Sequence, residues 1–260
     1  MIFYFSGTGN TRWAAQLMSS ATEEPLLCIA DEMAVGNCHY TLGQHERIGF
    51  CFPVHGWQPP HIVRSFLSRL NLQSPLGSLG QHYTYILCTC GDSTGLAVDM
   101  LSKQLMAKGI SVDSSLSLIM PESYVCLPFM YTDTPEREQQ KKRQAAIDVN
   151  DFVTVVQQRQ QGYSRLQKGF TPWTFSHVIG AYFNRYMITD SKFTVDADTC
   201  IHCGRCAKVC PVGNIEFSGT PEWKGNGSCT CCLSCYHHCP VHAINYGRIT
   251  RHRGQYYYKP

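Results

Sequence analysis

The sequence predicts an α/β fold, a doubly wound parallel sheet of five strands followed by a small α+β domain. Three observations support this class. Short apolar segments alternate with longer stretches of helical periodicity over residues 1–162. Nine of the 15 cysteines lie within residues 200–260. The charge balance also shifts, from 6 basic against 10 acidic residues over 1–134 to 16 against 9 over 135–260, which indicates two domains.

Five apolar segments in the N-terminal region have the character of strands covered on both faces. Such strands are apolar along their whole length instead of alternating. Helices are expected between them, because Pro60 suits a first helical turn and Gly109 suits a C-terminal stop. The expected strands are 1–5, 26–30, 47–54, 83–90 and 110–120, and the expected helices are 10–20, 60–70, 94–108 and about 135–161.

The segment after the last of these helices interrupts the alternation of strands and helices. Within it, residues 175–187 predict a short helix that packs an aromatic face. We therefore expect an N-terminal domain over 1–162, an ordered connector over 163–192 and a cysteine-rich domain over 193–260.

Composition excludes several classes of protein. Fifteen cysteines cannot all pair within one chain, and the first residues lack the basic start of a secretory signal. We therefore expect a cytoplasmic protein with metal-bound cysteines, no membrane span and no nucleic-acid partner, since the formal net charge is only +3. Lys141–Arg143 is interpreted as a solvated helix face. The oligomeric state is not predicted.

Two cysteine motifs of equal spacing lie in the C-terminal domain. In each, gaps of two, two and three residues separate four cysteines, and a proline follows the fourth. This spacing is typical of paired [4Fe–4S] clusters, where the fourth cysteine binds the other motif's cluster. Two zinc sites are the alternative, but zinc needs only four ligands and no third cysteine at this spacing. The predicted ligands are Cys200, Cys203, Cys206 and Cys239 for cluster 1, and Cys210, Cys229, Cys232 and Cys235 for cluster 2, with Cys231 off the pattern.

A small polar loop follows the first expected strand and opens the first expected helix. Backbone N–H groups at a helix N-terminus, together with hydroxyl and amide side chains, can bind an anion. The loop lacks the Gly-Lys-Ser/Thr of a Walker loop and the GxGxxG of a dinucleotide site, and a plain turn is the alternative. Its residues are Ser6, Gly7, Thr8, Gly9, Asn10 and Thr11.

This loop resembles the phosphate loop of flavodoxins, and residues 193–247 resemble two-cluster bacterial ferredoxins. The whole chain looks like the flavodoxin–ferredoxin fusion family. That resemblance implies a flavodoxin-like domain with FMN outside the carboxyl ends of its strands, then a ferredoxin-like domain with two [4Fe–4S] clusters. It also implies flavin contacts from two further loops, Pro53, Val54, His55, Gly56 and Trp57 after the third strand, and Thr89, Cys90, Gly91 and Asp92 after the fourth.

The function implied by the resemblance is electron transfer between the clusters and FMN, coupling one- and two-electron steps. Redox proteins of ferredoxin or flavoenzyme type are the expected partners. The alternative is an FMN-dependent reductase of a quinone or nitro compound, with His55, Cys90 and Tyr124 as candidate proton donors. A third possibility is a module docked in a larger redox complex through its basic C-terminal half.

The C-terminal tail and the histidines beside the cysteines can each be interpreted in two ways. The tail over residues 253–258 resembles the basic-aromatic tail of the family, and we expect it to pack as a strap on one domain. Four histidines flank the cluster cysteines and either tune the cluster potential through hydrogen bonds to sulfur or are ordinary loop residues. They are His202, His237, His238 and His242.

Overall fold

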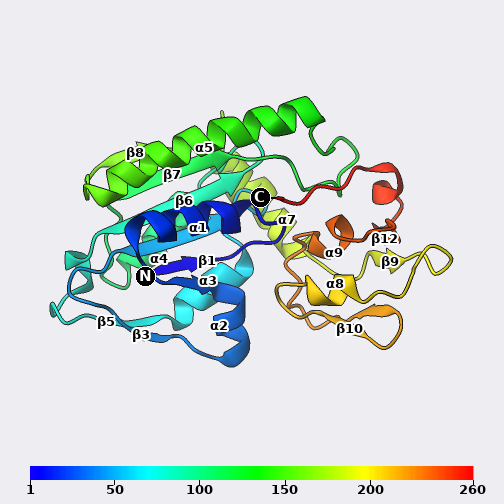
Figure 1. The fold of residues 1–260 in the computed structure, drawn as a ribbon, viewed down its shortest axis with the longest axis horizontal. Helices are drawn as coiled ribbons and strands as arrows, with labels where there is room; N and C mark the ends of the chain where they lie inside the picture. The colour runs from blue at the N-terminus through cyan, green and yellow to red at the C-terminus, as the bar shows by residue number, and fades with distance from the viewer. Residues whose placement is uncertain (260) are drawn as a thin grey trace.

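The computed structural model describes residues 1–259 and has a larger α/β part and a smaller cysteine-rich part, left and right in Figure 1. Six strands of the larger part form one parallel sheet in the order β2-β1-β4-β6-β7-β8. Its first five strands have the 2-1-3-4-5 order of flavodoxin-like folds. The bounds are β1 Ile2–Tyr4, β2 Leu26–Cys28, β4 Ile48–Pro53, β6 Thr84–Cys90, β7 Ser114–Ile119 and β8 Tyr163–Arg165.

The doubly wound α/β class is confirmed, but the prediction of five strands is wrong by one. The extra strand, β8, pairs with β7 inside the segment expected to be a connector. It has three residues, of which two are exposed, so no apolar run marks it in the sequence. Two further short strands, β3 His39–Thr41 and β5 Asn71–Gln73, form a separate parallel pair beside the sheet.

Helices cover both faces of the sheet (Figure 1). Phe50 and Phe52 of β4 point into one core with α2, α3 and α4, whereas Cys51 between them points into the other core with α1 and α5. The bounds are α1 Asn10–Thr22, α2 Ile29–Val35, α3 His61–Arg69, α4 Ala97–Met106 and α5 Pro135–Gln157, with a 3₁₀ turn η1 at Leu79–Gln81.

The connector after β8 is one continuous helical segment, which we call the connector helix. It comprises α6 Pro172–Thr174, a π-helical turn Phe175–Ile179 and α7 Gly180–Tyr186. The helix was predicted, but its packing was predicted wrongly. Ser176, Gly180 and Phe183 are buried, while most of its aromatic side chains are exposed. The spacing of apolar residues predicts a helix but does not determine which of its faces packs against the protein.

The cysteine-rich part lies beyond the carboxyl ends of the sheet strands (Figure 1). Two antiparallel strand pairs frame it, β9 with β12 and β10 with β11. Its short helices α8 and α9 each begin after a residue with left-handed φ, Gly204 and Leu233. In residues 1–259 no helix is long and apolar enough to cross a membrane. The bounds are β9 Phe193–Val195, α8 Arg205–Lys208, β10 Ile215–Phe217, β11 Pro221–Trp223, α9 Ser234–His237, β12 Ile244–Tyr246 and a 3₁₀ turn η3 Ile249–His252.

Candidate functional site

Two cavities in the cysteine-rich part divide the eight motif cysteines into two sets of four. Cavity 1 has an empty volume of about 320 Å³ and cavity 2 of about 290 Å³. Each set contains three cysteines of one motif and the last cysteine of the other, which is the grouping that the spacing predicts. Cavity 1 is lined by Cys200, Cys203, Cys206 and Cys239, and cavity 2 by Cys210, Cys229, Cys232 and Cys235.

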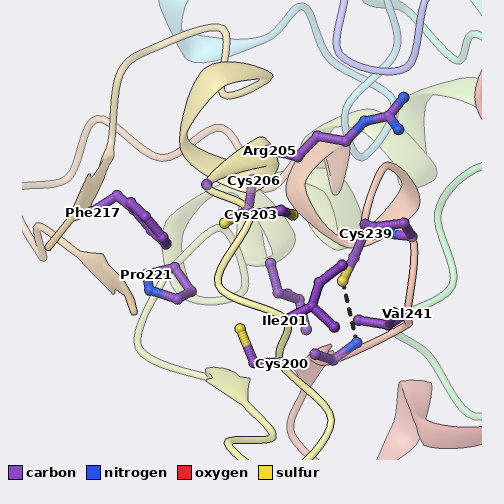
Figure 2. Close-up of a pocket in the computed structure, with 13 residues that line it drawn as sticks. Cys200, Ile201, Cys203, Arg205, Cys206, Phe217, Pro221, Cys239 and Val241 are labelled. Carbon is purple, nitrogen blue, oxygen red and sulfur yellow. Dashed lines mark hydrogen bonds between the residues drawn. The ribbon is translucent and has the colours of Figure 1, made fainter. Parts of the chain in front are cut away.

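The side chains around cavity 1 suit an iron–sulfur cluster. Figure 2 shows three of its cysteines along one loop and Cys239 on the neighbouring segment, with apolar Ile201, Phe217 and Val241 beside them. The dashed line in Figure 2 is the hydrogen bond from the Ala243 amide to Cys239 Sγ, at 3.2 Å. Four sulfur donors, an apolar wall and amide hydrogen bonds to sulfur are the features with which proteins hold and tune such clusters.

Cavity 2 repeats this chemistry. Asn214 donates its backbone N–H to Cys210 Sγ at 3.3 Å, at the same offset from its cysteine as Ala243 from Cys239. The Cys231 amide donates to Cys229 Sγ at 3.4 Å, so the off-pattern residue supplies a further bond to a motif sulfur. Apolar residues again complete the wall, namely Phe193, Val212, Ile215, Trp223 and Leu233. Both cavities therefore fit [4Fe–4S] clusters by donor type and surroundings.

Burial opposes the ionisation of four of the cavity thiols. Desolvation raises the pKa of Cys232 to about 11, and raises the pKa values of Cys206, Cys229 and Cys235 as well. A bound metal reverses this preference because its positive charge stabilises the thiolate, so loading releases protons. Within residues 1–259, no group of three or more His, Cys, Asp or Glu side chains is arranged to hold a single metal ion.

Cavity 2 adjoins the sheet edge at the predicted phosphate loop. A Cβ added to Gly7 would lie 2.5 Å from Cys232 Cβ, so only a residue without a side chain permits this approach. The apolar side chain of Val212, which lines cavity 2, also packs against the core of the sheet. Cavity 1 lies on the outer side, where Cys203 is exposed.

A buried hydrogen-bond chain also joins α9 to the sheet edge. The His237 Nδ1 accepts from the Tyr256 amide at 3.0 Å, so Nε2 carries the proton and donates to the Ser123 carbonyl at 2.7 Å. Desolvation lowers the pKa of His237 to about 4, so this ring is neutral at pH 7. The Tyr256 hydroxyl continues the chain by donating to Asn10 Oδ1 at 2.6 Å, and Asn10 Nδ2 donates to the Pro121 carbonyl at 3.2 Å.

The histidines flanking the cysteines make contacts that favour the simpler of the two interpretations. In the described residues, none of the four hydrogen-bonds to a cysteine sulfur. His202 bonds to the Gly219 carbonyl at 2.6 Å, and His238 bonds to the Ser234 carbonyl and stacks on Tyr257. His202 and His238 therefore hold loops together, as His237 does, whereas His242 packs its ring against Tyr236.

The C-terminal tail covers the loop over residues 6–11. The Tyr258 amide donates to the Thr8 carbonyl at 2.8 Å, the Tyr258 ring stacks on Trp13, and a Cβ on Gly9 would lie 3.1 Å from Tyr258 Cβ. Three of the loop's polar side chains have protein partners too. Thr11 Oγ1 lies 2.7 Å from Thr89 Oγ1, Ser6 Oγ accepts from the Gly9 amide, and Asn10 is bonded as described above.

The two other predicted flavin loops reach the same edge and contact each other. Trp57 Nε1 donates to Ser93 Oγ at 3.2 Å, and its ring lies 4.7 Å from the Phe175 ring of the connector helix. A Cβ on Gly56 would lie 2.5 Å from Phe183, and Asn184 Nδ2 donates to the His55 carbonyl at 3.0 Å. The connector helix therefore packs on the loop where a flavin ring was expected.

Most of the remaining residues of these loops are buried or contact other protein groups. Thr89 is paired with Thr11, and Gly91 packs against the Glu122 carboxylate. Cys90 is buried and desolvation raises its pKa, whereas Asp92 is exposed and Pro53 and Val54 are half-buried. The tail and the connector helix therefore pack directly on the loops predicted to contact FMN. No local pattern predicts these two coverings, because they come from segments distant in the sequence.

Comparisons with known proteins match one part of the chain at the sequence level. Residues 192–215 match the family model of a 4Fe-4S binding domain. No curated protein matches the chain.

Solved structures resemble the larger part at low identity. A putative flavoprotein from Bacteroides uniformis is 19% identical, covering 45% of this chain and 88% of its own, with a TM-score of 0.32. Azoreductase from Bacillus anthracis is 9% identical (60% and 98% covered, TM-score 0.37), and Megasphaera elsdenii flavodoxin is 15% identical (58% and 99%, TM-score 0.32).

The class of function follows from the fold and the match together. The matched segment contains four of the eight motif cysteines, and the sheet has flavodoxin-type strand order. The chain therefore combines a 4Fe–4S binding domain with a flavodoxin-like α/β part, and this combination indicates redox electron transfer.

Proposed function

We propose that the chain is an electron-transfer protein that holds two [4Fe–4S] clusters, one in each cavity. Cluster 1 is bound by Cys200, Cys203, Cys206 and Cys239, and cluster 2 by Cys210, Cys229, Cys232 and Cys235. The observation that supports this most strongly is the crossed grouping of the cysteines around the two cavities. Each cluster, when bound, accepts or releases one electron.

The residues around the cavities have three tasks in this proposal. The cysteine thiolates hold the clusters, and the apolar walls keep water from them. The amides of Ala243, Asn214 and Cys231 stabilise negative charge on sulfur, which favours the reduced state of the adjacent cluster. Exposed Cys203 makes cavity 1 the side for exchange with a partner redox protein, and the contact between Cys232 and Gly7 directs cavity 2 toward the sheet edge.

FMN binding at the sheet edge remains a prediction from the sequence. The tail packs on the loop predicted to hold its phosphate, and Phe175 of the connector helix packs on Trp57. Flavin titration of the full chain, followed by fluorescence, tests this point. Tight FMN binding that is lost in Thr8→Ala with Asn10→Ala supports a flavin site at the loop, whereas equal binding by this variant contradicts it.

The cluster proposal is tested by metal analysis and a redox titration under anaerobic conditions. We expect about eight irons and about eight acid-labile sulfides per chain, with visible absorption that is bleached by dithionite. Zinc in place of iron would overturn the proposal. About four irons, with the loss confined to one cysteine set, would overturn the two-cluster version and leave a single-cluster carrier.

A further inference from the structure

A buried hydroxyl group without a partner lies in the wall of cavity 2. Thr230 lines this cavity and is only 1% exposed. Within residues 1–259 its Oγ1 forms no hydrogen bond. A hydroxyl that is buried without a partner destabilises a fold, so proteins rarely leave one unpaired. Its position in the wall therefore indicates an acceptor inside the cavity.

The other polar side chains that line cavity 2 already have partners in the protein. The Asn214 side chain is hydrogen-bonded at both of its polar atoms, and Ser234 Oγ donates to the Val209 carbonyl at 2.9 Å. In the described part of the chain, Thr230 is the one residue lining either cavity whose buried side-chain oxygen or nitrogen lacks a partner. The unpaired hydroxyl is therefore specific to one position in one cavity.

The unpaired hydroxyl lies beside the thiol of Cys232. Desolvation raises the pKa of this thiol to about 11, and the Thr230 side chain acts in the opposite direction because a hydroxyl stabilises a thiolate. The sheet edge holds this segment in place, since Gly7 packs against Cys232 and the His55 ring lies against the Thr230 backbone. The hydroxyl is therefore positioned next to a predicted cluster ligand.

The equivalent position of the other motif has no hydroxyl. Thr230 follows the first cysteine of its motif, and Ile201 follows the first cysteine of the other motif. Each of the two residues lines the cavity of its own motif, but Ile201 is apolar and exposed. Because the two motifs have equal spacing, these residues mark a chemical difference between equivalent positions of the two cavities.

We propose that Thr230 donates its hydroxyl hydrogen to the Cys232 sulfur in the loaded chain and thereby favours the reduced state of cluster 2. The assignment rests on the two clusters proposed above and gives one of them a residue outside the cysteine set. A hydrogen bond to a ligand sulfur stabilises the negative charge that one added electron brings. The hydroxyl keeps its proton, so no covalent bond forms or breaks. This donor shifts an electron shared by the two clusters toward cavity 2.

An anaerobic redox titration of the full chain with dithionite, followed by EPR spectroscopy, tests the role of Thr230. Thr230→Val keeps the shape of the side chain and removes the hydroxyl. One of the two reduction steps should then become about tenfold less favourable, which is about 59 mV lower for a one-electron step, while the other stays unchanged. Thr230→Ser, which restores a hydroxyl, should recover most of this shift.

The matched control is Thr250→Val, also in the cysteine-rich part. Thr250 is fully buried, and its hydroxyl accepts from the Tyr246 amide at 2.7 Å and donates to Asn245 Oδ1 at 3.2 Å. This variant should lower stability in urea without moving either reduction step. Equal shifts in Thr230→Val and the control, or no shift in Thr230→Val while about eight irons are retained, would overturn the role of Thr230 and leave the proposed clusters intact.

Iron analysis separates this role from the proposed function. A parent chain that holds no iron, or only about four irons, overturns the two-cluster proposal and the role of Thr230 with it. If Thr230→Val retains only about four irons, Thr230→Ser decides between the outcomes. Recovery of about eight irons supports a hydroxyl donor at cluster 2, whereas continued loss contradicts it.

Discussion

The two cavities share one sequence motif and differ in their surroundings. Cavity 1 is bordered by exposed Cys203 and by Ile201, which is 57% exposed. In cavity 2, Cys235 is buried and Cys232 touches Gly7 of the sheet edge. Equal spacing therefore determines which cysteines group together, but not what each group faces. The environment of each set is decided by the contact between the two parts of the chain.

The difference between the two cavities can be tested first by removing one cysteine from each of them. Cys235→Ala and Cys203→Ala should each lower the iron content from about eight to about four per chain. Cys235→Ala should also cost on the order of 3 kcal/mol more in the free energy of unfolding, because Cys235 packs in the core of the cysteine-rich part. Iron analysis and urea unfolding of the anaerobic proteins measure both effects. Equal destabilisation by the two variants would show that the cavities are equivalent.

The contact of cavity 2 with the sheet edge can be tested through Gly7. Gly7→Ala places a Cβ 2.5 Å from Cys232 Cβ, and such overpacking costs up to about 3 kcal/mol. The control is Gly43→Ala, where the nearest atom is the end of a flexible side chain at 3.6 Å. Neither glycine has a left-handed φ, so backbone strain does not separate them. The urea midpoint should fall for Gly7→Ala and not for Gly43→Ala. Unchanged stability of Gly7→Ala would mean that the structure around Cys232 shifts at little cost to accept the added methyl group.

The burial of His55 at the sheet edge can be tested by measuring stability at several pH values. Desolvation lowers the pKa of His55 from 6.5 to about 4. Between these two values the ring is neutral in the folded chain and protonated in the unfolded chain. Stability from this residue is therefore intact above pH 6.5 and is lost as the pH falls toward 4. Between pH 7 and pH 5 the parent chain should lose about 2 kcal/mol more than His55→Leu. If the parent chain and His55→Leu lose the same unfolding free energy between pH 7 and pH 5 in chemical unfolding, His55 is not buried as described.

The smallest expected effect concerns the tail. Tyr256→Phe removes the hydroxyl that donates to Asn10, which should cost about 1 kcal/mol in unfolding free energy. Tyr257→Phe is the matched control, because that ring stacks on His238. The loop should also become more accessible in amide hydrogen exchange at Thr8 and Gly9. Indistinguishable exchange in the two variants would show that the hydroxyl does not hold the tail on the loop.

Much of this architecture could be predicted from the sequence because it rests on local patterns. Apolar runs and helical periods gave the parallel sheet, and the cysteine spacing gave the two sets that line the cavities. The missing strand, β8, has no apolar run to reveal it. The covering of the polar loop by Tyr258 and the approach of Cys232 to Gly7 depend on how distant segments dock. No spacing rule describes such contacts.

The hydrogen bond between Thr8 and Tyr258 has a consequence for how the chain is made. It joins residues near opposite ends of the sequence, so it cannot form until position 258 has been synthesised. N-terminal segments generally fold first during synthesis. The loop over residues 6–11 therefore stays without this cover until residue 258 has been made. Until then, the Thr8 carbonyl and the Trp13 ring lack their Tyr258 partners.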